Sequence, residues 1–168
     1  MRTMVLWLRG AVFTILVPGV LAGYIPYRLR NAGQGGSWIG LAGWAPVAAG
    51  AGLYLWCLSR FLLVGGTPAI HLTRPVRFLI GTPPPGLVRR GPYRFTRNPM
   101  YVAVVLMVLG QAALYGSWRV AVYGAGCWLA FYLIVVLVEE PHLRAVHGAA
   151  YDEYCQRTPR WIGLRRGR

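Results

Sequence analysis

Long apolar runs separated by shorter polar segments dominate the sequence. Four of these runs are long enough to cross a bilayer as helices, because a helix rises about 1.5 Å per residue and the hydrocarbon core is about 30 Å thick. They cover residues 4–26, 38–58, 100–118 and 119–138. The pattern predicts an all-α integral membrane protein with about four transmembrane helices, followed by a C-terminal helical tail outside the membrane.

The first run carries two prolines that affect its helix. Pro18 is expected to kink the helix and Pro26 to end it, since proline lacks the N–H that a helix interior requires. A secretory signal peptide is the alternative, because Arg2 and Arg9 precede the apolar core and residues 20–22 resemble a cleavage site. We expect the segment to be retained as a membrane helix.

The last two runs are joined by Gly116 and Ser117 alone, so they must form an antiparallel hairpin. Asn98 and Glu139 flank this hairpin and are therefore expected at the same face of the membrane. The second run is rich in small residues that suit close helix packing in lipid. These residues are Gly40, Gly43, Ala48, Gly50 and Gly52.

The whole chain, residues 1–168, is expected to form a single membrane domain. Two N-terminal spans occupy residues 1–64, a basic loop 65–98, the helix hairpin 99–138 and the tail 139–168. Within the loop, the apolar and basic decapeptide HLTRPVRFLI is typical of a segment lying on the membrane surface. The strings GGTPA and GTPP on either side of it are too short to establish a repeat.

Composition supports membrane integration and sets the orientation. Of the 168 residues, 56% are hydrophobic, and the net charge of +14 comes from 18 arginines and four acids. The arginines cluster between apolar runs rather than on a soluble module, so nucleic acid is not an expected partner. With four spans, 15 arginines lie on one side and three on the other, which places the loop and the tail in the cytoplasm. Three single cysteines and three scattered histidines predict neither a disulfide framework nor a metal site.

The strongest local signal is the segment RRGPYRFTRNPMY, residues 89–101. Pro92 and Pro99 predict an extended backbone between them, and Asn98 followed by Pro99 forms a helix start signal. The N-terminus of that helix would face a loop that contains Arg94 and Arg97. Such a junction suits an anion or an electron-rich group.

Glu139 and Glu140 lie side by side at the end of the fourth run. A carboxylate at the centre of a bilayer costs roughly 2.5–3.5 kcal/mol on insertion scales and less near the interface, so both glutamates call for partners. They can pair with Arg94 or Arg97 as structural salt bridges. Alternatively, the basic and aromatic loop and the acidic pair can bind a mixed-charge molecule such as S-adenosylmethionine, which has a carboxylate, an amine, ribose hydroxyls and an adenine. The spacing leaves both interpretations open.

A family resemblance bears on this choice. The segment GPYRFTRNPMY, a helix hairpin and then EEPHLRAVHGAAYDEYCQRTPRWIG resemble bacterial membrane methyltransferases related to isoprenylcysteine carboxyl methyltransferase and phospholipid N-methyltransferases. The resemblance covers about residues 87–162. It implies an S-adenosylmethionine-dependent methyltransferase of the bacterial inner membrane, with its cofactor pocket beside the last hairpin facing the cytoplasm and a substrate that enters from the bilayer.

The resemblance also implies particular site residues. The expected cofactor-binding residues are Gly91, Tyr93, Arg97, Asn98, Pro99, Tyr101, Glu139 and Glu140. The expected catalytic residues are Arg94, Arg97 and Glu140, and either arginine would hold a carboxylate or phosphate of the acceptor. Asn98 stands where the family frequently has His, and His147 stands where it frequently has Phe.

The methyl acceptor is expected to be membrane-embedded or amphipathic, with a carboxylate, an amine or a thiol as its reacting group. An amine or thiol must first lose a proton, and His142, two residues from Glu140, is a candidate general base for that step. Tyr151, Tyr154, Arg157 and Arg160 are interpreted as packing and anionic-lipid contacts. The alternative to an enzyme is a small membrane protein whose arginine-rich loops bind anionic lipid.

Overall fold

The computed structural model describes residues 2–30, 41–67, 84 and 86–161. These residues form helices joined by short loops, and no strand occurs among them. The α-helices are α1 (Arg2–Leu16), α2 (Ile25–Leu29), α4 (Trp44–Leu63), α6 (Pro99–Tyr115), α7 (Trp118–Ile134), α8 (Glu140–His147) and α9 (Ala149–Arg157). Two π turns, η1 (Val20–Tyr24) and η4 (Val135–Glu139), and one 3₁₀ turn, η3 (Gly91–Arg94), complete the assignment.

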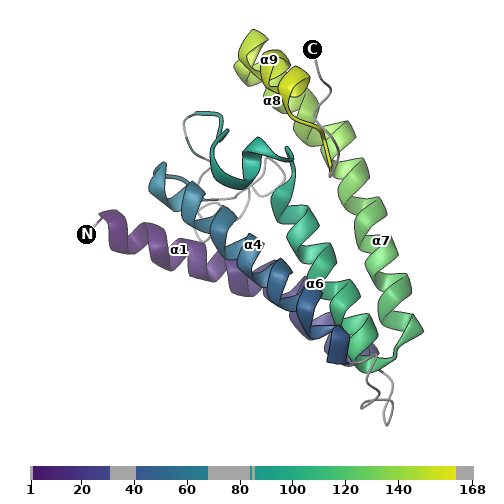
Figure 1. Ribbon diagram of the computed structural model, residues 1–168. Coiled ribbons are helices and arrows are strands. Elements are labelled where there is room, and N and C mark those ends of the chain that lie inside the picture. Colours follow the sequence, from purple (N-terminus) through teal and green to yellow (C-terminus); the bar gives the residue numbers. More distant parts are fainter. Residues whose placement is uncertain (1, 31–40, 68–83, 85, 162–168) are drawn as a thin grey trace.

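Three helical stretches are long and apolar enough to cross a membrane. They are Met4–Leu29, Trp44–Leu63 and Trp118–His147, and the apolar helix α6 adds 17 residues, the lower end of the usual range. The predicted all-α membrane architecture is therefore confirmed. Figure 1 shows α1, α4 and α6 side by side and α7 leaning away from α6 toward the end of the molecule that carries α8 and α9.

Pro26 does not end the first helix, contrary to the prediction. Helix α1 stops at Leu16, just before Pro18, but helical structure then continues through η1 and α2 to Leu29. Pro26 has no N–H to donate to the carbonyl of Ala22, four residues earlier. That carbonyl instead accepts a hydrogen bond from Gln111 Nε2 at 2.6 Å. A side chain of α6 thus replaces the missing backbone donor.

Two predicted helix ends are also wrong. Helix α4 continues to Leu63, five residues beyond the predicted end of the second span. The fourth span does not stop at Val138 but passes through η4 into α8 and ends at His147. In η4 the N–H of Glu140 bonds to the carbonyl of Val135, five residues earlier. The two glutamates consequently lie within a continuous helix and not beyond its end.

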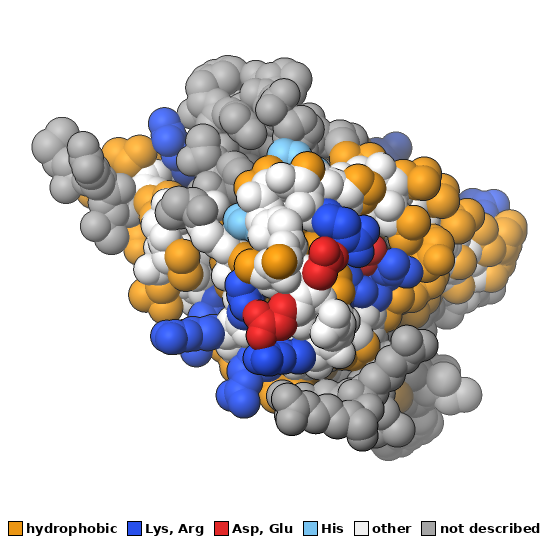
Figure 2. Space-filling model, turned by 90° about the horizontal axis from the view of Figure 1, so that it is seen from above, with side chains coloured by type: hydrophobic (Ala, Val, Ile, Leu, Met, Phe, Trp, Pro, Cys, Tyr) orange, Lys and Arg blue, Asp and Glu red, His pale blue; other side chains and the backbone are white. Residues whose placement is uncertain are grey.

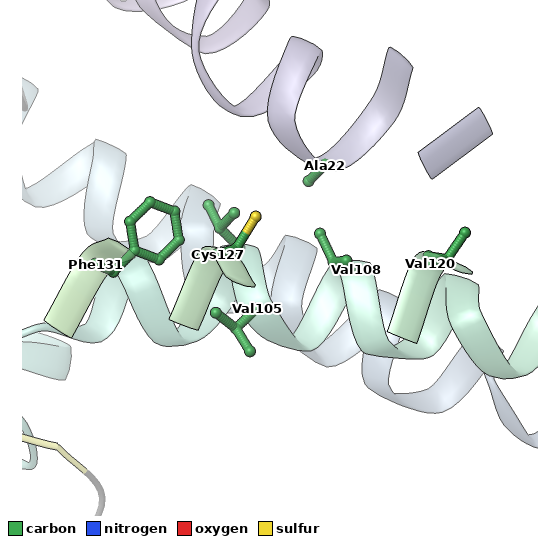
Figure 3. Packing of buried hydrophobic residues seen from close by; sticks show 7 residues of the cluster. Ala22, Val105, Val108, Val120, Cys127 and Phe131 are labelled. Carbon is green, nitrogen blue, oxygen red and sulfur yellow. The ribbon is translucent and has the colours of Figure 1, made fainter. Parts of the chain in front are cut away.

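The predicted hairpin is confirmed. Gly116 adopts a left-handed conformation with φ of +56° and turns the chain between α6 and α7. The core of the hairpin contains Val105 and Val108 from α6 and Val120, Cys127 and Phe131 from α7. Figure 3 shows Ala22 of the first helix lying above this layer.

Small residues bring α4 and α6 into close, antiparallel contact. A Cβ added at Gly43 would lie 2.5 Å from the carbonyl oxygen of Gly110, and one added at Gly50 would lie 2.6 Å from that of Ala103. The predicted role of these two glycines is confirmed, whereas Gly52 has nothing within 4 Å. The decapeptide HLTRPVRFLI, Gly40 and the tail beyond Trp161 lie outside the described residues.

Candidate functional site

A cavity of about 420 Å³ opens where α6 and α7 diverge. Apolar residues of α1, α4, α6 and α7 line its deeper part, and charged and aromatic residues from both ends of the hairpin line the rest. Six of the residues predicted from the sequence meet here. They are Tyr93, Arg97, Asn98, Tyr101, Glu139 and Glu140.

Glu139 lies at the junction of the two hairpin helices. Tyr101, on the first turn of α6, donates a hydrogen bond of 2.6 Å to Glu139 Oε1. No arginine in the described part of the chain forms an ion pair with this carboxylate, so a tyrosine is its main polar partner. This contact across 38 residues confirms that the two ends of the hairpin meet at one face.

Glu140 has a different environment, because its carboxylate lies between two arginines. Arg97 NH1 lies 3.0 Å from its Oε1, and Arg160 binds both carboxylate oxygens at 2.6 and 2.9 Å. Both Glu140 and Arg97 are nearly buried, with side chains 8% and 11% exposed. Such a triad must remain intact, because removal of one partner leaves a buried charge without compensation. The predicted salt bridge between the acidic pair and Arg97 is therefore present, at Glu140.

The segment before α6 is tied to the tail by hydrogen bonds. Asn98 Nδ2 and Thr96 Oγ1 both donate to the carbonyl of Arg160, at 2.9 and 3.1 Å. The N–H of Arg97 donates to the carbonyl of Pro159 at 2.9 Å. Figure 2 looks onto this end of the molecule and shows acidic side chains beside arginines, with apolar side chains on the flank.

Two local predictions about this segment need correction. The backbone is not extended throughout, because Gly91–Arg94 forms a 3₁₀ turn with Gly91 at φ of +67°. Asn98 does occupy the N-cap position and Pro99 does begin α6, but the Asn98 side chain makes no capping hydrogen bond. Its amide is used to hold the tail, as described above.

Three tyrosines lie near the triad formed by Glu140, Arg97 and Arg160. Tyr154 donates a hydrogen bond of 2.7 Å to the carbonyl of Tyr93, and Arg97 NH1 approaches Tyr151 Oη at 3.4 Å and Cys155 Sγ at 2.7 Å. Burial raises the pKa of Tyr93, Tyr151 and Tyr154 above the usual value of 10.0. All three phenols are therefore neutral at physiological pH and act as hydrogen-bonding groups rather than as anions.

Three predicted site residues do not line the cavity: Gly91, Arg94 and Pro99. Arg94 is exposed, Pro99 is buried at the start of α6, and Gly91 contacts α4. His142 and His147 both belong to the lining, as does Tyr54 from α4. Of these, His142 is the residue for which the sequence predicts a chemical role.

Arg160 has contacts that differ most from those predicted. The sequence favoured a packing or lipid contact for this residue. In the structure its guanidinium forms a bidentate salt bridge with Glu140, and its carbonyl accepts hydrogen bonds from Thr96 and Asn98. Its only sequence signal is its place in the string PRW. Trp161, the next residue, packs against Trp128 with ring centroids 4.4 Å apart and fixes the tail to α7.

The fold and the site define an α-helical membrane protein with a charged cavity at the mouth of its last hairpin. The sequence model of one family, described as phospholipid methyltransferase, matches residues 47–150, more than half of the chain. The chain therefore belongs to the phospholipid methyltransferase family, a family of membrane methyltransferases, and the resemblance found in the sequence is confirmed. No curated protein and no solved structure matches the chain.

Proposed function

We propose that this protein transfers a methyl group from S-adenosylmethionine to a membrane-embedded or amphipathic acceptor. Family membership supports methyl transfer. The observation that carries the proposal is the meeting of six residues, distant in sequence, around one cavity of about 420 Å³. That volume falls in the range of pockets that hold small molecules and cofactors.

The polar groups of the cavity fit this cofactor. Arg97 Nε is buried and has no hydrogen-bond partner among the described residues, so it is available to the carboxylate of an amino acid moiety. Glu139 accepts a hydrogen bond from Tyr101 at one carboxylate oxygen and can also accept from an amine or a ribose hydroxyl. Tyr93 and Tyr151 offer aromatic surface for an adenine.

The cofactor, when bound, supplies a methyl group already activated by its sulfonium. The protein then has to position the acceptor in line with that group and exclude water. Phe131 and Val135 line the cavity next to Glu139 and keep this region apolar. Arg97 and Glu140 hold each other in place, and His142, also in the lining, is the candidate to take a proton from an amine or thiol acceptor.

The rest of the lining supports the proposed acceptor class. Phe13, Val17 and Leu21 from the first helix and Val104 from α6 form an apolar extension of the cavity between the membrane helices. This arrangement suits a molecule with a polar reacting group near Glu139 and Glu140 and an apolar portion among the helices. We assign the cavity mouth to the cytoplasm, where nucleotide-derived cofactors are available.

Calorimetric titration of S-adenosylmethionine into nanodisc-held protein tests the proposal. Wild type should bind, and Glu139→Gln should bind at least tenfold more weakly, since it loses a charged hydrogen-bond acceptor worth about 1.5 kcal/mol or more. The matched control is Glu153→Gln, which alters an exposed acid paired with Arg157 and should bind like wild type. In parallel, radiolabelled methyl should pass from the cofactor to a component of a lipid extract.

A folded wild-type protein that binds no S-adenosylmethionine would overturn the proposal. The non-enzymatic alternative, a membrane protein that binds anionic lipid through its arginines, would then be favoured. Equal weakening in Glu139→Gln and Glu153→Gln would instead indicate a general charge effect and would remove Glu139 from the site.

A further inference from the structure

The loop before α6 carries a second group of arginines, which lie outside the cavity. Arg90 and Arg94 are exposed, and neither lines the cavity. Arg60, on the last turn of α4, lies under the same loop, because a Cβ added at Gly91 would be 2.9 Å from Arg60 Nε. We call Arg60, Arg90 and Arg94 the loop arginines.

No acidic side chain of this protein is available to the loop arginines. The sequence contains only four acids, and all lie in the described part of the chain. Glu139 is bonded to Tyr101 and Glu140 to Arg97 and Arg160. Asp152 and Glu153 pair with Arg144 and Arg157, respectively. The loop arginines therefore have no acidic partner within the chain and are open to an anionic group from outside it.

Arg60 is an example of an arginine without an acidic partner. Its Nε atom is buried and has no hydrogen-bond partner in the part of the chain that the structure describes. Trp56, one turn earlier on α4, also converges on Gly91, with Nε1 3.3 Å from the position of an added Cβ. The positive φ of Gly91 lets the loop backbone approach both side chains closely, so the loop lies against the end of α4 at this residue.

Exposed apolar side chains adjoin these charges. Phe95 is 68% exposed and follows Arg94 directly, and Leu63, the last residue of α4, is 73% exposed. Because α4 and α6 run antiparallel, this loop lies between the end of one membrane helix and the start of the next. Aromatic rings and arginines gather at that depth where a bilayer changes from hydrocarbon to headgroups.

We propose that the loop arginines, with Phe95 and Leu63, form a binding surface for the phosphate of an anionic phospholipid. The arginines contact the phosphate, and the exposed ring and aliphatic chain lie among the upper parts of the acyl chains. A free phosphate would use the arginines alone and leave both apolar side chains in water, so a lipid is the partner that the surface fits. This inference does not depend on the reaction proposed for the cavity.

Binding of short-chain phosphatidylglycerol to the detergent-solubilised full chain tests the surface. Arg90→Gln/Arg94→Gln should bind about thirtyfold more weakly than wild type, because each arginine at an anionic surface contributes about a factor of five. The matched control is Arg144→Gln/Arg157→Gln, which removes the same charge from two exposed arginines already paired with acids. Its affinity should change less than threefold. Phe95→Ala should weaken lipid binding while leaving the thermal midpoint unchanged.

Two further probes identify the source of the phosphate. Phosphatidylcholine, whose headgroup carries no net charge, should bind at least tenfold more weakly than phosphatidylglycerol. Glycerol phosphate alone should bind weakly and be insensitive to Phe95→Ala. Equal losses in the two double variants, or glycerol phosphate binding as tightly as the lipid, would overturn the proposal.

Discussion

At the scale of single residues, Glu139 and Glu140 show how two identical neighbours acquire different roles. Successive residues on a helix point about 100° apart. Glu140 therefore meets Arg97 and Arg160, while Glu139 meets Tyr101 at the cavity. The sequence predicted that the pair needed partners, but it gave no basis for dividing the partners between the two carboxylates.

This division leads to opposite expectations for two conservative variants. Glu140→Gln should lower the free energy of unfolding by about 3 kcal/mol, because it leaves two arginine charges without their carboxylate, one of them nearly buried. Glu139→Gln should cost less than about 1 kcal/mol, since the amide oxygen still accepts from Tyr101. Denaturant titration in mixed micelles measures both values. Equal destabilisation by the two changes would contradict the assignment.

The bidentate salt bridge between Arg160 and Glu140 leads to a second prediction at the residue scale. Arg160→Lys keeps the charge but loses the planar, paired geometry, and should lower the free energy of unfolding by about 1.5 kcal/mol. Arg157→Lys is the control, because Arg157 is 71% exposed and its pair with Glu153 should contribute less than about 0.5 kcal/mol. The same titration compares them, and a cost for Arg160→Lys no larger than that of the control would be the contrary result.

At the scale of elements, the sequence predicted which segments are helical better than where each helix ends. Apolar runs determine helices in a membrane, because only a helix satisfies its own backbone hydrogen bonds there. Pro26 is a local stop signal that was overridden, and Pro141 also lies within a continuous helical stretch; a π turn precedes each proline. The donor that compensates for Pro26 is Gln111, 89 residues from the accepting carbonyl of Ala22, and no local pattern reveals it.

The pairing of Pro26 with Gln111 is testable as a double-mutant cycle. Gln111→Leu should lower the free energy of unfolding by about 1 kcal/mol, the scale of side-chain hydrogen bonds in membranes, because it removes the bond that Gln111 donates to the carbonyl of Ala22. In a Pro26→Ala background the backbone N–H is restored, and the same change should cost about half as much or less. An unchanged cost in that background would show that Gln111 acts independently of the proline.

Part of the candidate site could be predicted because residues that are close in the sequence are also close in the structure. Tyr93, Arg97 and Asn98 reach the cavity because they lie within one short segment leading into α6. Arg94, in the middle of that segment, points elsewhere because the 3₁₀ turn rotates it to the exposed side. The role of Arg160 was not predicted, because it depends on contacts with Glu140, 20 residues away, and with Asn98, 62 residues away.

At the scale of the whole molecule, the distribution of arginines and the position of the cavity mouth should predict the same orientation in the membrane. The cavity mouth, the loop arginines and α9 lie at one end of the described structure, and the arginine count along the sequence predicts, by the positive-inside rule, that this end faces the cytoplasm. Arg157 on α9 and Arg119 at the hairpin turn are exposed and lie at opposite ends of α7 and its continuation. They are therefore suitable positions for reporters of the two membrane faces.

Single cysteine substitutions at these positions test the orientation. In inside-out membrane vesicles a membrane-impermeant maleimide should label Arg157→Cys, and in intact cells it should label Arg119→Cys, with the wild type as background. Two of the natural cysteines, Cys57 and Cys127, are buried in helices and should contribute little to that background. The reverse pattern would place the cavity mouth on the side where S-adenosylmethionine is absent. It would contradict both the arginine count and the proposed cofactor, because a site that uses a cytoplasmic metabolite must open to the cytoplasm.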